Sequence, residues 1–274
     1  MTNLLNSSLI RLTKNKIFWI INIFSIVLAF FMIYTQYSDM KKYGEIIETE
    51  QLMLNYSTMI GIIIAIFTSL FLGVEYSDGA IRNKISIGHK RINIYLSNLI
   101  IVTITSLFSY ILFILVVASI GIPLFGPITI SISKLLMLLG CIFVTIIAYS
   151  SIFTFLAMII SNKTITSITA IMLSFGMMFY SLMALDRLAQ PEYIDTMLMK
   201  DGVQEIINTK NNRYLTGKKK ELIKLSIDII PTGQMFQIAG RITPNLKVLP
   251  IYSACIIIVF TGAGLILFNK KELK

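Results

Sequence analysis

Six long apolar segments, each without an ionisable side chain in its middle, constrain the fold of this chain more than any other feature. A helix needs about 20 mostly apolar residues to cross the hydrocarbon core of a bilayer. Each segment reaches that length, so each is predicted to be a membrane-spanning helix. The predicted spans are residues 17–37, 52–74, 94–120, 135–160, 165–185 and 248–268.

The composition agrees with a membrane protein. Of the 274 residues, 55% are apolar and 14% are charged, whereas roughly a quarter of the residues in a soluble domain are charged. Such a chain cannot cover itself with polar surface. We therefore expect an all-α integral membrane protein with six transmembrane helices, forming one transmembrane domain over residues 1–274.

The basic residues indicate how the chain is oriented. They gather before the first span, between the second and third spans, and after the last span. These residues are Arg11, Lys14, Lys16, Arg82, Lys84, Lys90, Arg91, Lys270, Lys271 and Lys274. Short loops rich in Lys and Arg stay in the cytosol. We predict that both termini are cytosolic and that the long region 186–247 is extracellular.

Two segments outside the spans also have helical patterns. In residues 4–16, apolar residues recur at helical spacing beside basic ones, which predicts an amphipathic helix lying in the membrane interface. In the outer region, an apolar pattern over 222–230 predicts a helix that ends at Pro231. The adjoining stretch 229–236 is apolar enough to dip back toward the bilayer before the last span.

Several kinds of chemistry have no counterpart in the sequence. His89 is the only histidine, no His, Cys or carboxylate cluster has metal-ligand spacing, and there is no glycine-rich phosphate loop. No charged residue lies within a span to relay protons or hold a coupling ion. The net charge of +10 comes without a basic face of interleaved aromatics, so nucleic acid is not an expected partner.

The most informative polar segment is the charged interruption between the second and third spans, residues 75–91. It is short, rich in Lys and Arg, and predicted to face the cytosol. A small helix is expected over residues 79–87. Glu75, at the end of the second span, is expected to pair with one of the basic residues nearby.

The whole chain resembles the membrane subunit of a type-2 ABC exporter. The resemblance rests on six spans, an amphipathic N-terminal helix, a long outer region and a short basic tail, Phe268–Lys274. Its most specific part is the stretch Phe71–Lys84, followed by Gly88 and the basic pair at 90–91. The resemblance is closest to small bacterial permeases that export bacteriocins, lantibiotics, other amphipathic peptides or drugs. Such permeases often carry an acidic residue in the N-terminal helix, whereas residues 4–16 contain none.

The resemblance implies a mechanism and a set of residues. Residues 79–87 would be a coupling helix that docks on a separate ATPase subunit, with Ile81 and Ile85 in an apolar groove and Arg82 and Lys84 at its polar rim. The coupling residues would be Glu75, Asp78, Gly79, Ile81, Arg82, Lys84 and Ile85. The second and fifth spans would line the substrate path, with Thr68, Ser69, Thr166, Thr169, Met177 and Phe179 as its residues.

The same resemblance implies the partners. An ABC ATPase dimer would bind ATP and Mg²⁺, so this chain would need no cofactor of its own and would not be an enzyme. A second copy, or a homologous permease, would complete the pore in the bacterial cytoplasmic membrane. The substrate would be a hydrophobic or amphipathic molecule.

Two other functions remain open from the sequence. One is a sensor or immunity protein that binds a toxic peptide without transporting it. The other is a secondary transporter, which the missing internal symmetry and the missing intramembrane charge disfavour.

Overall fold

The computed structural model describes residues 2–44, 46–200, 203–243 and 246–271 of the chain. Among these residues, six stretches of helix are long and apolar enough to cross a membrane. They are α2 (Lys16–Tyr43), the pair α3 (Thr49–Asn55) and α4 (Ser57–Ser77), α6 (Arg91–Phe125), α7 (Ile132–Ile159), α8 (Lys163–Ala189) and α11 (Leu249–Lys270). The prediction of a six-span, predominantly helical membrane protein is confirmed.

Most of these helices extend beyond the predicted spans at one or both ends. Helix α6 has 35 residues, a length of about 52 Å at 1.5 Å per residue, while the hydrocarbon core is about 30 Å thick. The apolar length of a segment marks the part that matches the bilayer. The remaining length of such a helix fits the polar headgroup regions on either side of the hydrocarbon core, where polar side chains stay hydrated.

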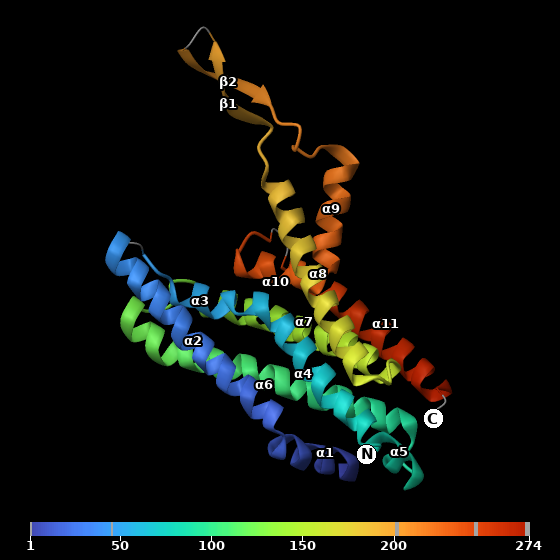
Figure 1. Ribbon diagram of the computed structural model, residues 1–274. Coiled ribbons are helices and arrows are strands. Elements are labelled where there is room, and N and C mark those ends of the chain that lie inside the picture. The colour runs from blue at the N-terminus through green and yellow to red at the C-terminus, as the bar shows by residue number, and fades with distance from the viewer. Residues whose placement is uncertain (1, 45, 201–202, 244–245, 272–274) are drawn as a thin grey trace.

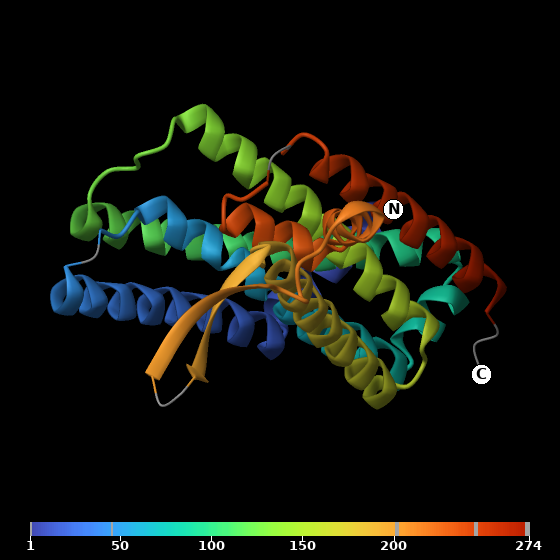
Figure 2. The same ribbon diagram turned by 90° about the horizontal axis from the view of Figure 1, so that it is seen from above.

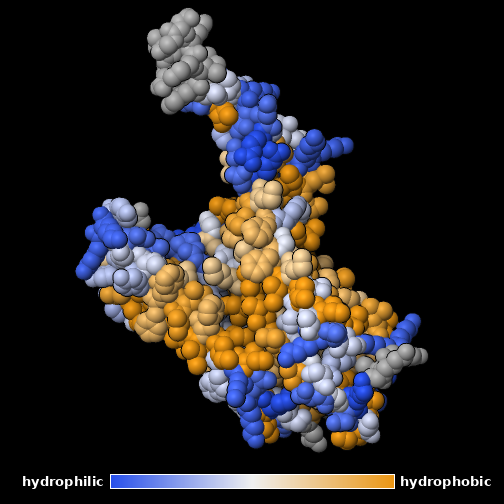
Figure 3. Space-filling view, in the orientation of Figure 1, coloured by the Kyte–Doolittle hydropathy of each residue, from blue (hydrophilic) through white to orange (hydrophobic). Residues whose placement is uncertain are grey.

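Helix α4 is the centre of the bundle. It packs against α2, α6, α7, α8 and α10 (Pro231–Ala239), whereas α2 packs mainly on α6 and α11 mainly on α7. Close packing with α7 depends on Gly61, because a Cβ at this position would lie 2.7 Å from the ring of Tyr149. The outer helices α8 and α11 present apolar side chains outward, among them Met172, Met183 and Ile258, and the apolar surface in Figure 3 covers the bundle between hydrophilic ends.

The two ends of the bundle carry different elements. Both termini, α1 (Thr2–Lys14) and α5 (Ala80–Ser86) lie at one end, and a β-hairpin projects from the other (Figure 1). Seen from above, α2 and α11 lie at opposite flanks of the bundle (Figure 2). The helix predicted over 4–16 corresponds to α1, which ends before Asn15, because the Asn15 side chain caps the start of α2. Leu4 and Leu12 of α1 are buried, and the helix packs on α6.

The region 186–247 contains an element that we did not predict. Strands β1 (Tyr193–Lys200) and β2 (Val203–Lys210) form an antiparallel hairpin in which Tyr193 pairs with Lys210. The all-α prediction is therefore wrong for this segment. The sequence does carry a signal, since Asp-Gly between two strands is typical of hairpins; here that pair is residues 201–202, which lie outside the described residues.

The rest of this region is helical. The pattern at 222–230 is confirmed as α9 (Gly217–Ile229). Pro231 then begins α10, at a first-turn position where the missing N–H of proline costs nothing. Helix α10 is almost entirely buried and packs against α4, α7 and α8 as well as α9. The stretch expected to dip toward the bilayer therefore inserts between the spans.

Candidate functional site

The segment between the second and third spans folds as a helical turn, a glycine and a short helix. Helix α4 ends at Ser77, and Gly79 then adopts a left-handed conformation, with φ of 70°, before α5 begins. This conformation favours glycine because other residues meet steric strain there. Helix α5 occupies the predicted segment and packs on both α4 and α6.

A buried carboxylate holds this segment to the bundle. Glu75 is 1% exposed and accepts hydrogen bonds from Lys84 Nζ at 2.8 Å and from Asn98 Nδ2 at 2.9 Å. Arg11 of α1 forms an ion pair with the same carboxylate. We call these four residues the Glu75 junction. Because they come from α4, α5, α6 and α1, one side chain connects four helices.

The junction confirms one prediction and adds a partner to it. Glu75 pairs with a nearby basic residue, as expected, and that residue is Lys84. The pairing with Arg11 was missed because the two residues are far apart in the sequence and their approach depends on how α1 packs on the bundle. The guanidinium also lies 4.5 Å from the centre of the Phe71 ring, a favourable cation–π contact.

The structure corrects which face of α5 is available to another protein. Ile81 is 1% exposed and belongs to the core of this chain, and Ile85 packs partly against the same core. Ile81 cannot fill a groove on a partner while the helix keeps this position, and Ile85 offers only part of its side chain. Lys84 is likewise engaged by Glu75. The exposed residues of this turn, together with Asp78 before it, are Arg82, Asn83, Ser86 and Ile87.

A second set of contacts ties the remaining helix ends on this side. The Met158 carbonyl of α7 accepts hydrogen bonds from the Tyr76 hydroxyl at 2.5 Å and from Lys271 Nζ at 3.0 Å. Arg91 of α6 donates to the Phe268 carbonyl of α11 at 3.1 Å. Burial lowers the pKa of Lys271 to about 8. Residues 272–274 of the predicted basic tail lie outside the described residues.

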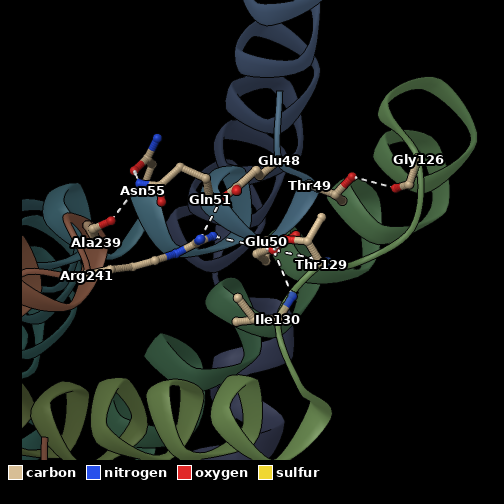
Figure 4. A network of polar contacts seen from close by, with 10 residues as sticks. All are labelled: Glu48, Thr49, Glu50, Gln51, Asn55, Gly126, Thr129, Ile130, Ala239 and Arg241. Carbon is tan, nitrogen blue, oxygen red and sulfur yellow. Dashed lines mark hydrogen bonds and ion pairs between the residues drawn. The ribbon is translucent and has the colours of Figure 1, made fainter. Parts of the chain in front are cut away.

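The opposite end of the bundle holds another buried carboxylate, Glu50, at the start of α3 (Figure 4). It accepts hydrogen bonds from the backbone N–H of Thr129 at 3.1 Å and of Ile130 at 3.2 Å. Arg241 lies 3.6 Å from Glu50 and 2.5 Å from Glu48. The carboxylate thereby joins α3 to the loop after α6 and to the turn after α10.

Two further hydrogen bonds strengthen that end. Gln51 Nε2 donates to the Ala239 carbonyl at 2.6 Å, and the Thr49 hydroxyl donates to the Gly126 carbonyl at 3.1 Å (Figure 4). We did not single out Glu50 from the sequence, in which it lies just before the predicted span 52–74. A carboxylate in the first turn of a helix is favoured by the helix dipole, so the position of Glu50 could have indicated the start of a helix.

The six residues predicted for the substrate path differ in burial. Thr68 and Ser69 are buried inside the bundle, and Thr166 is buried in the first turn of α8, bonded to the Asn162 carbonyl. Met177 packs on the core, whereas Phe179 is 58% exposed on the outer side of α8. Thr169 is half-buried. The helices that carry them, α4 and α8, do pack against each other.

Comparison with known proteins adds no family assignment. No family model matches the chain, and a search of curated proteins gave no match. Within the part of the chain that the structure describes, no group of three or more His, Cys, Asp or Glu side chains is placed to hold a metal ion.

Proposed function

We propose that this chain is the membrane subunit of an ATP-driven type-2 ABC exporter in the bacterial cytoplasmic membrane. It would carry a hydrophobic or amphipathic substrate, such as an antimicrobial peptide or a drug. ATP and Mg²⁺ would bind to a separate ATPase dimer. A second copy of the chain, or a homologous permease, would complete the transporter.

The charges of the loops and the positions of the elements support the proposed orientation. Helix α1, α5 and both chain ends share one end of the bundle (Figure 1), and the basic loops belong to that end. By the rule that basic loops stay in the cytosol, this end faces the ATPase. The hairpin, α9 and the Glu50 contacts would then face outward.

The observation that carries the proposal is the Glu75 junction. A partner that moves α5 also moves Lys84, and a buried ion pair resists separation because an unpaired charge would be left inside the protein. The displacement would pass through Glu75 into α4 and through Asn98 into α6. Helix α4 lies at the centre of the bundle, so a shift there reaches most of the spans.

The proposal is tested by purifying the tagged full-length chain from its native membranes and identifying soluble ATPases that copurify. Ile87, which is 78% exposed beside α5, is the contact residue to change. Ile87→Asp should abolish copurification. The matched control is Ile46→Asp, since Ile46 is 95% exposed at the opposite end and should have no effect. Equal recovery of the ATPase with both variants would refute the docking role of α5.

A further inference from the structure

A cavity of about 610 Å³ opens at the hairpin end of the bundle, between α8, α9 and the turn after α10. Its volume lies within the range of about 300–1,000 Å³ that is usual for small-molecule sites. Most of its lining is apolar. The apolar lining residues are Leu185, Leu188, Ala189, Ile227, Ile242 and Val248.

Four polar residues complete the lining: Lys224, Asp228, Gln237 and Thr243. Gln237 is only 6% exposed and donates from Nε2 to Asp228 Oδ1 at 2.8 Å. The Thr243 hydroxyl donates in turn to Gln237 Oε1 at 3.3 Å. These two hydrogen bonds connect Thr243, Gln237 and Asp228, and they hold the Asp228 carboxylate in place at the cavity wall.

The two charged lining residues are not equivalent. Lys224 is exposed, so water solvates its ammonium group. Asp228 is half-buried, and in the described parts of the chain no basic group, Lys224 included, is close enough to form an ion pair with its carboxylate. A carboxylate in mainly apolar surroundings is costly unless a cation compensates it. Lys224 lines the same cavity, but within the described parts of the chain no ion pair neutralises the Asp228 carboxylate.

We infer that this cavity binds a lipophilic cation, with Asp228 as its counter-charge and the apolar wall as the surface for its hydrophobic body. Leu185 and Val248 lie at the ends of two spans, so such a molecule reaches the site from the edge of the bilayer. As a substrate class for the exporter, the inference rests on the proposed function. As a binding site, it stands on the cavity alone.

The test is saturable binding of tetraphenylphosphonium to the purified full-length chain in lipid nanodiscs, with empty nanodiscs subtracted. Tetraphenylborate, an anion of nearly the same shape, is the matched probe for charge. We expect the cation to bind more tightly than the anion. Asp228→Asn keeps an oxygen for Gln237 and should weaken cation binding by roughly 10- to 100-fold, the loss of one charge-assisted contact.

Two more variants locate the site. Ile242→Trp places a large ring in the cavity from a residue that is 58% exposed, so the fold should persist while binding of both probes is lost. Lys224→Gln removes a positive charge from the cavity lining and should therefore not weaken cation binding. The inference is overturned if Asp228→Asn changes cation affinity by less than about threefold, or if the anion binds more tightly and Lys224→Gln abolishes its binding.

The outcomes separate this inference from the proposed function. Binding needs no ATPase, and α9, which carries Asp228, lies at the end of the bundle away from α5 (Figure 1). Asp228→Asn should therefore retain the copurified ATPase. A wild-type chain that binds no cation but retains its ATPase would refute the site alone. A chain that binds the cation but recruits no ATPase would refute the exporter alone.

Discussion

Replacement of Glu75 by alanine should be among the most damaging single changes in the polar structure of this protein. The carboxylate is inaccessible to solvent, while Lys84 and Arg11 retain side-chain exposures of 17% and 35%. Removing it leaves two cations and the amide of Asn98 without their acceptor. The helices α1, α5 and α6 would each lose their polar contact with α4.

The size of the effect follows from the burial of the pair. Removing one partner of a buried ion pair costs about 3–5 kcal/mol, and the lower figure applies because both cations still reach some water. For a chain of this size, a loss of about 3 kcal/mol corresponds to a fall in melting temperature on the order of 10 °C. Glu75→Gln should cost less, because the amide oxygen can still accept from Asn98.

The assay is thermal unfolding of the purified protein in detergent, read from the fraction that stays monodisperse after heating. Lys84→Met and the double variant with Glu75→Gln complete a cycle, and we expect a coupling energy of about 1–3 kcal/mol, typical of residues in direct contact. Ser77→Ala, which alters an exposed side chain in the same turn, should be neutral. A Glu75→Ala variant that melts at the same temperature as Ser77→Ala, or a cycle without coupling, would contradict this role of Glu75.

Three further predictions test other parts of the account. Gly61→Leu should destabilise the protein by at least about 1–3 kcal/mol, because the added side chain overlaps the Tyr149 ring. The pKa of Lys271 is lowered from 10.5 to about 8, so the unfolded chain binds more protons between these pH values. The melting temperature of the wild type relative to Lys271→Met should therefore rise with pH over this window. In a cysteine-free background, Ser86→Cys should resist labelling from outside intact cells and Lys218→Cys should react.

Each of these has a clear contrary result. A Cβ added at Gly140 would meet no neighbouring atom within 4 Å, so Gly140→Leu is the control, and equal stability of the two leucine variants would contradict close packing at Gly61. A constant difference between wild type and Lys271→Met from pH 8 to 10.5 would show that the ammonium is not desolvated. Labelling of Ser86→Cys in intact cells would invert the proposed orientation.

The spans could be read from the sequence because apolar length alone determines whether a helix fits the bilayer. The short helix before Gly88 could be placed because a run of charged residues separates two spans there. The burial of Ile81 could not be read in the same way. Ile81 and Ile85 are one turn apart and share a face of the helix. Whether this face turns toward the bundle depends on the direction of the chain at Gly79, and helical spacing does not reveal that direction.

The polar contacts were the hardest part to predict. Arg11 and Glu75 meet only after α1 has packed on α6, so their pairing depends on tertiary structure. Arg241 approaches Glu48 from a turn almost two hundred residues later in the chain. The Asp228 cavity likewise forms only when α8, α9 and the turn after α10 come together. The hairpin differs, because its Asp-Gly signal was local and was overlooked.

The central claim is that α5 transmits the movement of a separate ATPase to the spans. The most direct measurement is ATP hydrolysis by the ATPase that copurifies with the chain from its native membranes. We expect hydrolysis in preparations of the wild type and of Ile46→Asp, and none in preparations of Ile87→Asp. Purified wild-type chain without ATPase activity, or equal activity in all three preparations, would contradict it.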